Sequence, residues 1–231
     1  MATVEDELCA SEQLTRNLSL ATFDPAIAEV LAAPEAPEQT VTEATLSATI
    51  EELATLVEAH DSYTGEHAAH VSGLSERLAV ALGCSREELR TIAVAGRLHD
   101  VGKVAVPDAV LHKPDVLTTE ERDVMRAHAV IGAEIVGRIP DLRPIAALIR
   151  AHHERWDGTG YPDGLAGAEI PLGARVLAVA DAYFAITTSR PYQAARDHTF
   201  AVAEIERCSG SQFDPAVVRA LEDLPVSQLL H

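Results

Sequence analysis

Residues 98–103 read Leu-His-Asp-Val-Gly-Lys, and this stretch ends a run of apolar residues at helical spacing. Residues 85–88, Ser-Arg-Glu-Glu, have the pattern of a capping box, which predicts that a helix begins there. Ile92 lies on the apolar face of that helix, and His99 and Asp100 continue the same face. We therefore expect this imidazole and this carboxylate to point into the protein interior.

The same helical spacing of apolar residues recurs along the chain from about residue 41. The apolar faces are formed by Leu46, Ile50, Leu53 and Val57, by Val71, Leu74, Leu78 and Leu82, and by Val124, Ile131 and Ile135. A second capping box at 118–121 precedes the last of these faces, and further helices are expected over 141–153, 172–188, 197–208 and 214–222. Strand signals are sparse and no tandem repeat is visible. The sequence therefore predicts an all-α helical bundle.

The composition fits a helical domain with a sizeable core. The chain has 231 residues, of which 47% are apolar and only 4% aromatic, so Ala, Leu, Val and Ile must fill the interior. No apolar run reaches the length of about 18 residues that a membrane span needs, so we expect no transmembrane helix. Residues 1–7 are acidic and lack the basic region of a secretory signal, so the expected location is the cytoplasm.

The charge and the cysteines exclude some classes of function. The net charge of −18 disfavours general DNA binding, because affinity for the phosphate backbone rests on clustered Lys and Arg. A small phosphate ligand stays compatible with this charge, since bound cations reverse the local sign of the field. Cys9, Cys84 and Cys208 lie far apart without a Cys-x-x-Cys spacing, which argues against a disulfide framework and against a thiolate zinc site.

Residues 1–40 differ from the rest of the chain. They carry eight acidic residues against a single Arg16, and they end in Ala-Pro-Glu-Ala-Pro-Glu at 33–38. Such a segment buries little apolar surface, so we predict a loosely ordered acidic arm and linker, followed by one domain over residues 41–231. A regulatory protein partner that binds the arm is a further hypothesis.

Seven polar residues fall on the inward faces or at the ends of the predicted helices. They are His67, His99, Asp100, His128, His152, His153 and Asp181. A single histidine on an apolar face is more often a hydrogen-bonded core residue than a ligand, but an unpaired buried carboxylate costs on the order of several kcal/mol. Seven such residues are not expected as independent accidents, and bound divalent cations would satisfy them together. Ligands of His and Asp without thiolate suit iron, manganese or zinc rather than calcium.

The remaining five histidines serve as a comparison. They are His60, His70, His112, His198 and His231, which lie off these faces or in predicted loops and tails. We predict that their side chains are solvated or structural, with His70 the nearest in sequence to the candidate set.

The order of these motifs resembles that of the HD-GYP family, a branch of the HD phosphohydrolase superfamily. The resemblance covers residues 45–220 and rests on His-Asp-Val-Gly-Lys at 99–103 followed by His-His-Glu-Arg-Trp-Asp-Gly-Thr-Gly-Tyr-Pro at 152–162. Tyr-Thr-Gly-Glu-His at 63–67 and Arg-Pro-Tyr at 190–192 extend it. A lone His-Asp pair is weak evidence, whereas the two longer motifs in this order are very specific. The resemblance implies a helical HD domain with a metal site between its helices.

The resemblance also implies two divalent metal ions, with iron or manganese preferred. By that pattern one metal takes His67, His99, Asp100 and Asp181, and the other takes Asp100, His128, His152 and His153, so that Asp100 bridges. Some members of the family hold a third metal through a Glu four residues before the first ligand histidine. Tyr63 stands at that position here, so we predict two metals.

The activity that the resemblance implies is hydrolysis of the bacterial messenger cyclic di-GMP to pGpG, with onward cleavage to GMP as a further step. Two cations about 3.5–4 Å apart can supply a bridging hydroxide at neutral pH, which would attack phosphorus in line. Asp100 and Lys103 are the predicted catalytic residues. Lys103 is predicted to contact a phosphate oxygen, with a solvated surface lysine as the alternative reading. Tyr161 in the Gly-Tyr-Pro loop and Arg190 are predicted to bind substrate.

Two positions depart from the family pattern. Phe184 stands where the family commonly has Asp, and Gln193 stands where it commonly has a basic residue. Both positions lie near the nucleotide in the family, so three alternatives stay open. The first is a phosphodiesterase for a related cyclic dinucleotide such as cyclic GMP-AMP. The second is a binding or scaffold module with weak or no turnover, and the third is a generic HD nucleotide phosphohydrolase.

Overall fold

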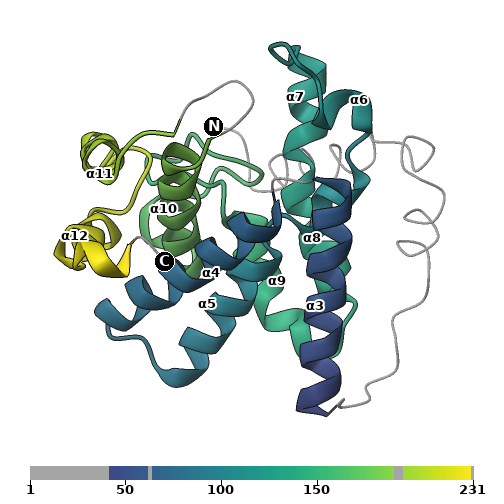
Figure 1. The fold of residues 1–231 in the computed structure, drawn as a ribbon, viewed down its shortest axis with the longest axis horizontal. Helices are drawn as coiled ribbons and strands as arrows, with labels where there is room; N and C mark the ends of the chain where they lie inside the picture. The colour runs from purple at the N-terminus through teal and green to yellow at the C-terminus, as the bar shows by residue number, and fades with distance from the viewer. Residues whose placement is uncertain (1–41, 62–63, 190–194, 230–231) are drawn as a thin grey trace, which may run out of the picture.

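The computed structural model describes residues 42–61, 64–189 and 195–229 (Figure 1). These parts of the chain are helical, and the only β-type pairings within them are two isolated bridges. The prediction of an all-α fold is therefore confirmed. The acidic arm predicted over residues 1–40 lies outside the described residues. None of the described helices combines the length and the hydropathy that a membrane span requires.

The described α-helices follow the predicted periodicity closely. They are α3 (Glu43–His60), α4 (Thr64–Ala81), α5 (Arg86–Leu98), α6 (Asp108–Leu111), α7 (Thr119–Arg126), α8 (His128–Gly137), α9 (Arg143–Ala151), α10 (Leu172–Thr187), α11 (His198–Arg207) and α12 (Pro215–Asp223). Short 3-10 helices lie between them: η2 (Val101–Ala105), η3 (Pro140–Leu142), η4 (Gly167–Glu169) and η5 (Val226–Gln228). Both predicted capping boxes are present, at Ser85 before α5 and at Thr118 before α7.

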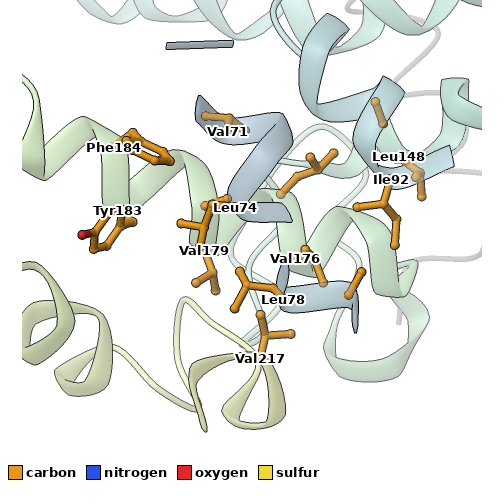
Figure 2. Close-up of a cluster of buried hydrophobic side chains, with 14 of the residues drawn as sticks. Val71, Leu74, Leu78, Ile92, Leu148, Val176, Val179, Tyr183, Phe184 and Val217 are labelled. Carbon is orange, nitrogen blue, oxygen red and sulfur yellow. The ribbon is translucent and has the colours of Figure 1, made fainter. Parts of the chain in front are cut away.

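The core lies where α4 and α10 cross. Leu74 and Leu78 of α4 are fully buried and meet Val176 and Val179 of α10, as Figure 2 shows. Helix α4 also packs along α5, and α10 carries α11 and α12 on the side away from α3 (Figure 1). The apolar faces predicted from the sequence are thus the faces that pack together. Any polar residue on those faces must enter the same interior.

The segment around His128 departs from the prediction. The sequence places Val124, His128 and Ile131 on one face of one helix, whereas the structure ends α7 at Arg126 and begins α8 at His128. A turn at Ala127 separates the two helices, and the His128 ring donates from Nδ1 to the Met125 carbonyl at 2.7 Å. This side-chain bond occupies a carbonyl at the end of α7, so the histidine sits at a helix boundary rather than within a helix.

Candidate metal centre

The structure brings together all seven predicted residues of the ligand set. His67 comes from α4, Asp181 from α10, and the His99–Asp100 pair from the junction of α5 and η2. The other histidines are His128 at the start of α8, and His152 and His153 directly after α9. These segments pack on one another, with α5 and α10 each in contact with α4 and α9, and α8 in contact with α9 and η2, so residues far apart in sequence meet in one place. Their assignment as metal ligands stays a prediction.

The side-chain donor atoms form two groups. The donor atoms of His67, His99 and Asp100 all lie within 4.8 Å of one another, and so do those of His128, His152 and His153. Asp100 faces both groups, since Oδ2 is 3.5 Å from His99 Nε2 and Oδ1 is 3.5 Å from His128 Nε2. Asp181 Oδ1 lies 3.1 Å from His67 Nε2 and so belongs beside the first group. A carboxylate between two groups of nitrogen donors is suited to bridge two cations.

Three of the histidine rings are held in the same way. Each follows the end of a helix and bonds through Nδ1 to a carbonyl three residues earlier: His99 to Gly96 at 2.9 Å, His128 to Met125 at 2.7 Å and His152 to Ile149 at 2.6 Å. A carbonyl only accepts, so Nδ1 carries the hydrogen and Nε2 keeps a free lone pair. The carbonyls in the last turn of a helix otherwise lack partners, so each bond satisfies a backbone carbonyl and also fixes an imidazole ring.

These features fit a divalent cation. His99 Nε2 is fully buried and has no hydrogen-bond partner within the described part of the chain, which is costly unless a ligand meets it. The carboxyl ends of α5, α7 and α9 also reach this place, and each carries a partial negative charge that favours a cation. Oriented Nε2 lone pairs beside carboxylate oxygens are the donors that iron, manganese and zinc accept.

The protonation states agree with this fit. Burial alone would raise the pKa of Asp100, but the Lys103 ammonium and the adjacent histidine rings hold it well below its ordinary value. Burial and the nearby His128 ring lower the pKa of His153 to about 3. Burial likewise lowers the pKa of His152 well below its ordinary value. At neutral pH the carboxylate is therefore ionised and these rings are neutral, which are the forms that bind metal.

Lys103 lies inside the site and is not the solvated surface lysine of the alternative reading. Its ammonium is 2.8 Å from Asp100 Oδ2 and 3.4 Å from Asp61 Oδ2, and its side chain is only 21% exposed. Asp61 caps the end of α3 and is buried. The sequence analysis did not single out Asp61, although it follows Val57 by four residues and so continues the apolar face of α3.

Gly102 has a packing role that the sequence analysis missed. A Cβ at this position would lie 2.0 Å from the His128 carbonyl oxygen and 2.5 Å from the Gly132 amide nitrogen. Only glycine lets η2 approach the backbone of α8 this closely. The contact holds Asp100, just before η2, next to His128 at the start of α8.

The Gly-Tyr-Pro loop folds back on the end of α9. A Cβ on Gly160 would lie 2.4 Å from the Arg155 amide nitrogen, so this glycine packs against the backbone of Glu154 and Arg155. The buried Glu154 accepts hydrogen bonds from the amides of Asp163 at 2.7 Å and Gly164 at 3.1 Å, which ties the loop down. The Tyr161 ring stacks on His153 with centroids 4.9 Å apart. The loop thus supports the metal centre from one side.

The two departures from the family pattern have different outcomes. Phe184 is buried and stacks on His70 with centroids 5.2 Å apart, so it is a core residue. Gln193 lies outside the described residues, as do Tyr63 and the predicted substrate-binding Arg190. Among the comparison histidines, His60 Nε2 is 3.1 Å from the Val106 carbonyl, which is a structural role.

Comparison with known proteins agrees with the motifs. The family model for the HD domain matches residues 51–217. The chain is 46% identical over 178 residues to the cyclic di-GMP phosphodiesterase response regulator RpfG of Xanthomonas campestris pv. campestris, covering 75% of this chain and 46% of that protein. It is 40% identical over 171 residues to the 3'3'-cGAMP-specific phosphodiesterase 2 of Vibrio cholerae, covering 73% of this chain and 33% of that protein. The chain thus spans less than half the length of each relative.

A solved structure supports the fold. The crystal structure of the cyclic GMP-AMP specific phosphodiesterase V-cGAP3 of Vibrio cholerae matches with a TM-score of 0.59 at 22% sequence identity. The match covers 77% of this chain and 48% of that one. At this identity the likeness concerns the arrangement of the helices.

Proposed function

The chain belongs to the HD domain family, and we propose that it is a metal-dependent phosphodiesterase that opens cyclic di-GMP to pGpG. The observation that carries the proposal is the pair of donor groups joined by Asp100, with His99 Nε2 buried beside it and unpaired among the described residues. If these histidines were only structural core residues, His99 Nε2 would be expected to have a hydrogen-bond partner. The cyclic dinucleotide as substrate comes from the relatives, whose names specify cyclic di-GMP or 3'3'-cGAMP.

The residues divide between two cation sites. His67, His99 and Asp181 would hold one ion, His128, His152 and His153 the other, and Asp100 both. Iron or manganese is the proposed metal, because the ligands are imidazole and carboxylate without thiolate. When bound, two such ions lower the pKa of a water molecule and neutralise phosphoryl oxygens, which is the chemistry that phosphodiester hydrolysis needs.

The surrounding side chains orient the substrate. Lys103 places a positive charge 2.8 Å from Asp100, where it can also bind a non-bridging phosphate oxygen next to the metal centre. Tyr161 is proposed to contact the substrate beside His153, with the Arg126 guanidinium 5.1 Å from the centre of its half-buried ring. Arg190 is proposed to bind the second phosphate or a guanine edge. Onward cleavage of pGpG to GMP is a slower step of the same site.

A second candidate substrate is 3'3'-cGAMP. It is favoured by the 40% identity to a phosphodiesterase named for that molecule, which is close to the identity with the relative named for cyclic di-GMP. Both substrates share the phosphodiester and differ in one base, so the metal centre serves either.

The test is product analysis with a double variant. Purified protein loaded with Mn²⁺, or with Fe²⁺ under anaerobic conditions, should convert cyclic di-GMP to pGpG, measured by chromatography. His99→Ala combined with Asp100→Ala should abolish both turnover and bound metal, whereas His112→Ala, at an exposed histidine, should leave both intact. Full turnover by the double variant would contradict the proposed function. Tight binding of the dinucleotide by the metal-loaded protein without product would favour a binding module instead.

A further inference from the structure

A pocket adjoins the metal centre and extends to α11. Its volume is about 560 Å³, within the range of sites for small organic ligands. His153 and Asp181 of the candidate metal centre line it, and so do Phe200 and Glu204 of α11. A nucleotide whose phosphate lies at the metal centre can therefore place its base against α11. The mechanism proposed above assigns no role to these two α11 residues.

Phe200 has the features of a stacking surface. Its side chain is 41% exposed, whereas the side chains of Phe184 and Phe213 are buried. The Arg196 guanidinium carbon lies over the ring, 4.1 Å from its centre, and the ring also lines the pocket. Exposed aromatic rings in nucleotide sites bind bases of any type by stacking.

Glu204 lies one helical turn after Phe200 and lines the same pocket. Its side chain is 39% exposed, and its two carboxylate oxygens accept hydrogen bonds from Arg207, one from Nε at 2.9 Å and one from Nη2 at 2.5 Å. A base that binds Glu204 must therefore displace the Arg207 guanidinium, whose side chain is 68% exposed and can turn to solvent. An ionised carboxylate has two acceptor oxygens and no donor.

We propose that Phe200 and Glu204 form a guanine subsite, in which the base stacks on the ring and Glu204 accepts hydrogen bonds from its N1–H and N2–H. Guanine presents two adjacent donors on this edge. Adenine presents an unprotonated N1 there, whose lone pair would face the carboxylate. A site that hydrogen-bonds one base rejects the base that leaves its polar groups unpaired. The inference rests on the proposed function, because that function places the phosphate.

The experiment uses GMP and AMP, which carry one base and one phosphate each. Binding of both to the Mn²⁺-loaded full chain is measured by calorimetry. We expect GMP to bind at least about tenfold more tightly than AMP. Glu204→Gln should remove or reverse this preference, since a glutamine amide offers one donor and one acceptor and so matches adenine. Glu206→Gln, at an exposed position of α11 that does not line the pocket, is the matched control and should change nothing.

The Phe200 variants test the stacking. Phe200→Ala should weaken both nucleotides by about tenfold, and Phe200→Tyr should restore binding. Equal binding of GMP and AMP by the unaltered protein, binding of neither, or a Glu204→Gln variant that keeps the preference would overturn the subsite. Turnover of cyclic di-GMP without a GMP preference would leave the proposed function standing. A GMP preference without turnover would support the subsite and contradict the proposed phosphodiesterase activity.

Discussion

The metal centre and the α11 pocket share His153 and Asp181 but are built differently. In the candidate metal centre, the side chains come from α4, α10, the α5–η2 junction, α8 and the end of α9; five of the seven are buried, and backbone carbonyls hold three of the imidazole rings. In the pocket, Phe200 and Glu204 stand on one peripheral helix and are partly exposed (Figure 1). The groups proposed to act on the phosphate are thus positioned by the packing of the whole fold. The groups proposed to bind the base can be changed without disturbing that packing.

The largest effect is expected for Gly102→Ala. The new Cβ would lie 2.0 Å from the His128 carbonyl oxygen, so η2 and α8 would have to separate. We expect a loss of at least about 3 kcal/mol in the free energy of unfolding, together with loss of metal. Urea denaturation and elemental analysis measure the two. Gly137→Ala is the control, because its Cβ would meet nothing closer than 3.9 Å. Normal metal content in Gly102→Ala would contradict the role given to this contact.

Leu74→Ala and Phe200→Ala compare the two regions directly. Leu74 is fully buried in the core, so its truncation should lower the free energy of unfolding by about 2–5 kcal/mol. Phe200→Ala should lower it by much less, about 1 kcal/mol or below, since the ring is 41% exposed. Equal destabilisation by the two variants would mean that the Phe200 ring is itself part of the core and would remove the contrast.

Acid should destabilise the metal-free protein through the buried histidines of the candidate metal centre. His153, with its pKa lowered to about 3, stays neutral when folded, whereas an unfolded histidine takes up a proton near pH 6.5. The unfolded state therefore binds more protons between these values, and the free energy of unfolding falls as the pH decreases from about 6.5. The slope is at most about 1.4 kcal/mol per pH unit for each such histidine. Urea unfolding at pH 7 and pH 5 should show a smaller difference in His153→Gln but not in His112→Gln.

The smallest effect is expected for Asp61→Asn. The substitution removes one of the two carboxylates beside Lys103, so the ammonium is positioned less well. We expect kcat to fall by about tenfold or less, with KM and metal content nearly unchanged. Asp61→Glu should recover part of the loss. Asp115→Asn, at an exposed carboxylate, provides the control. A change in metal content would show that Asp61 acts on the ligands rather than on Lys103.

Helical periodicity was sufficient to predict the fold and to bring the seven polar residues together. His67 and Asp181 could be placed because each lies on an apolar face that must be buried. Asp61 and Gly102 could not be assigned their roles, because these depend on which helices approach each other. The spacing of apolar residues along η2 or α8 does not show how closely the two segments approach each other. The boundary at Ala127 was missed for a similar reason, since a side-chain bond from His128 accompanies it.

The Nδ1 bonds of His99, His128 and His152 bear on how the proposed ions would bind. Each ring is attached to the last turn of the helix before it, and turning the ring over would require that turn to open. If these rings are the metal ligands, the fold alone directs their Nε2 lone pairs into the site, and binding an ion would need no rearrangement of the three helix ends.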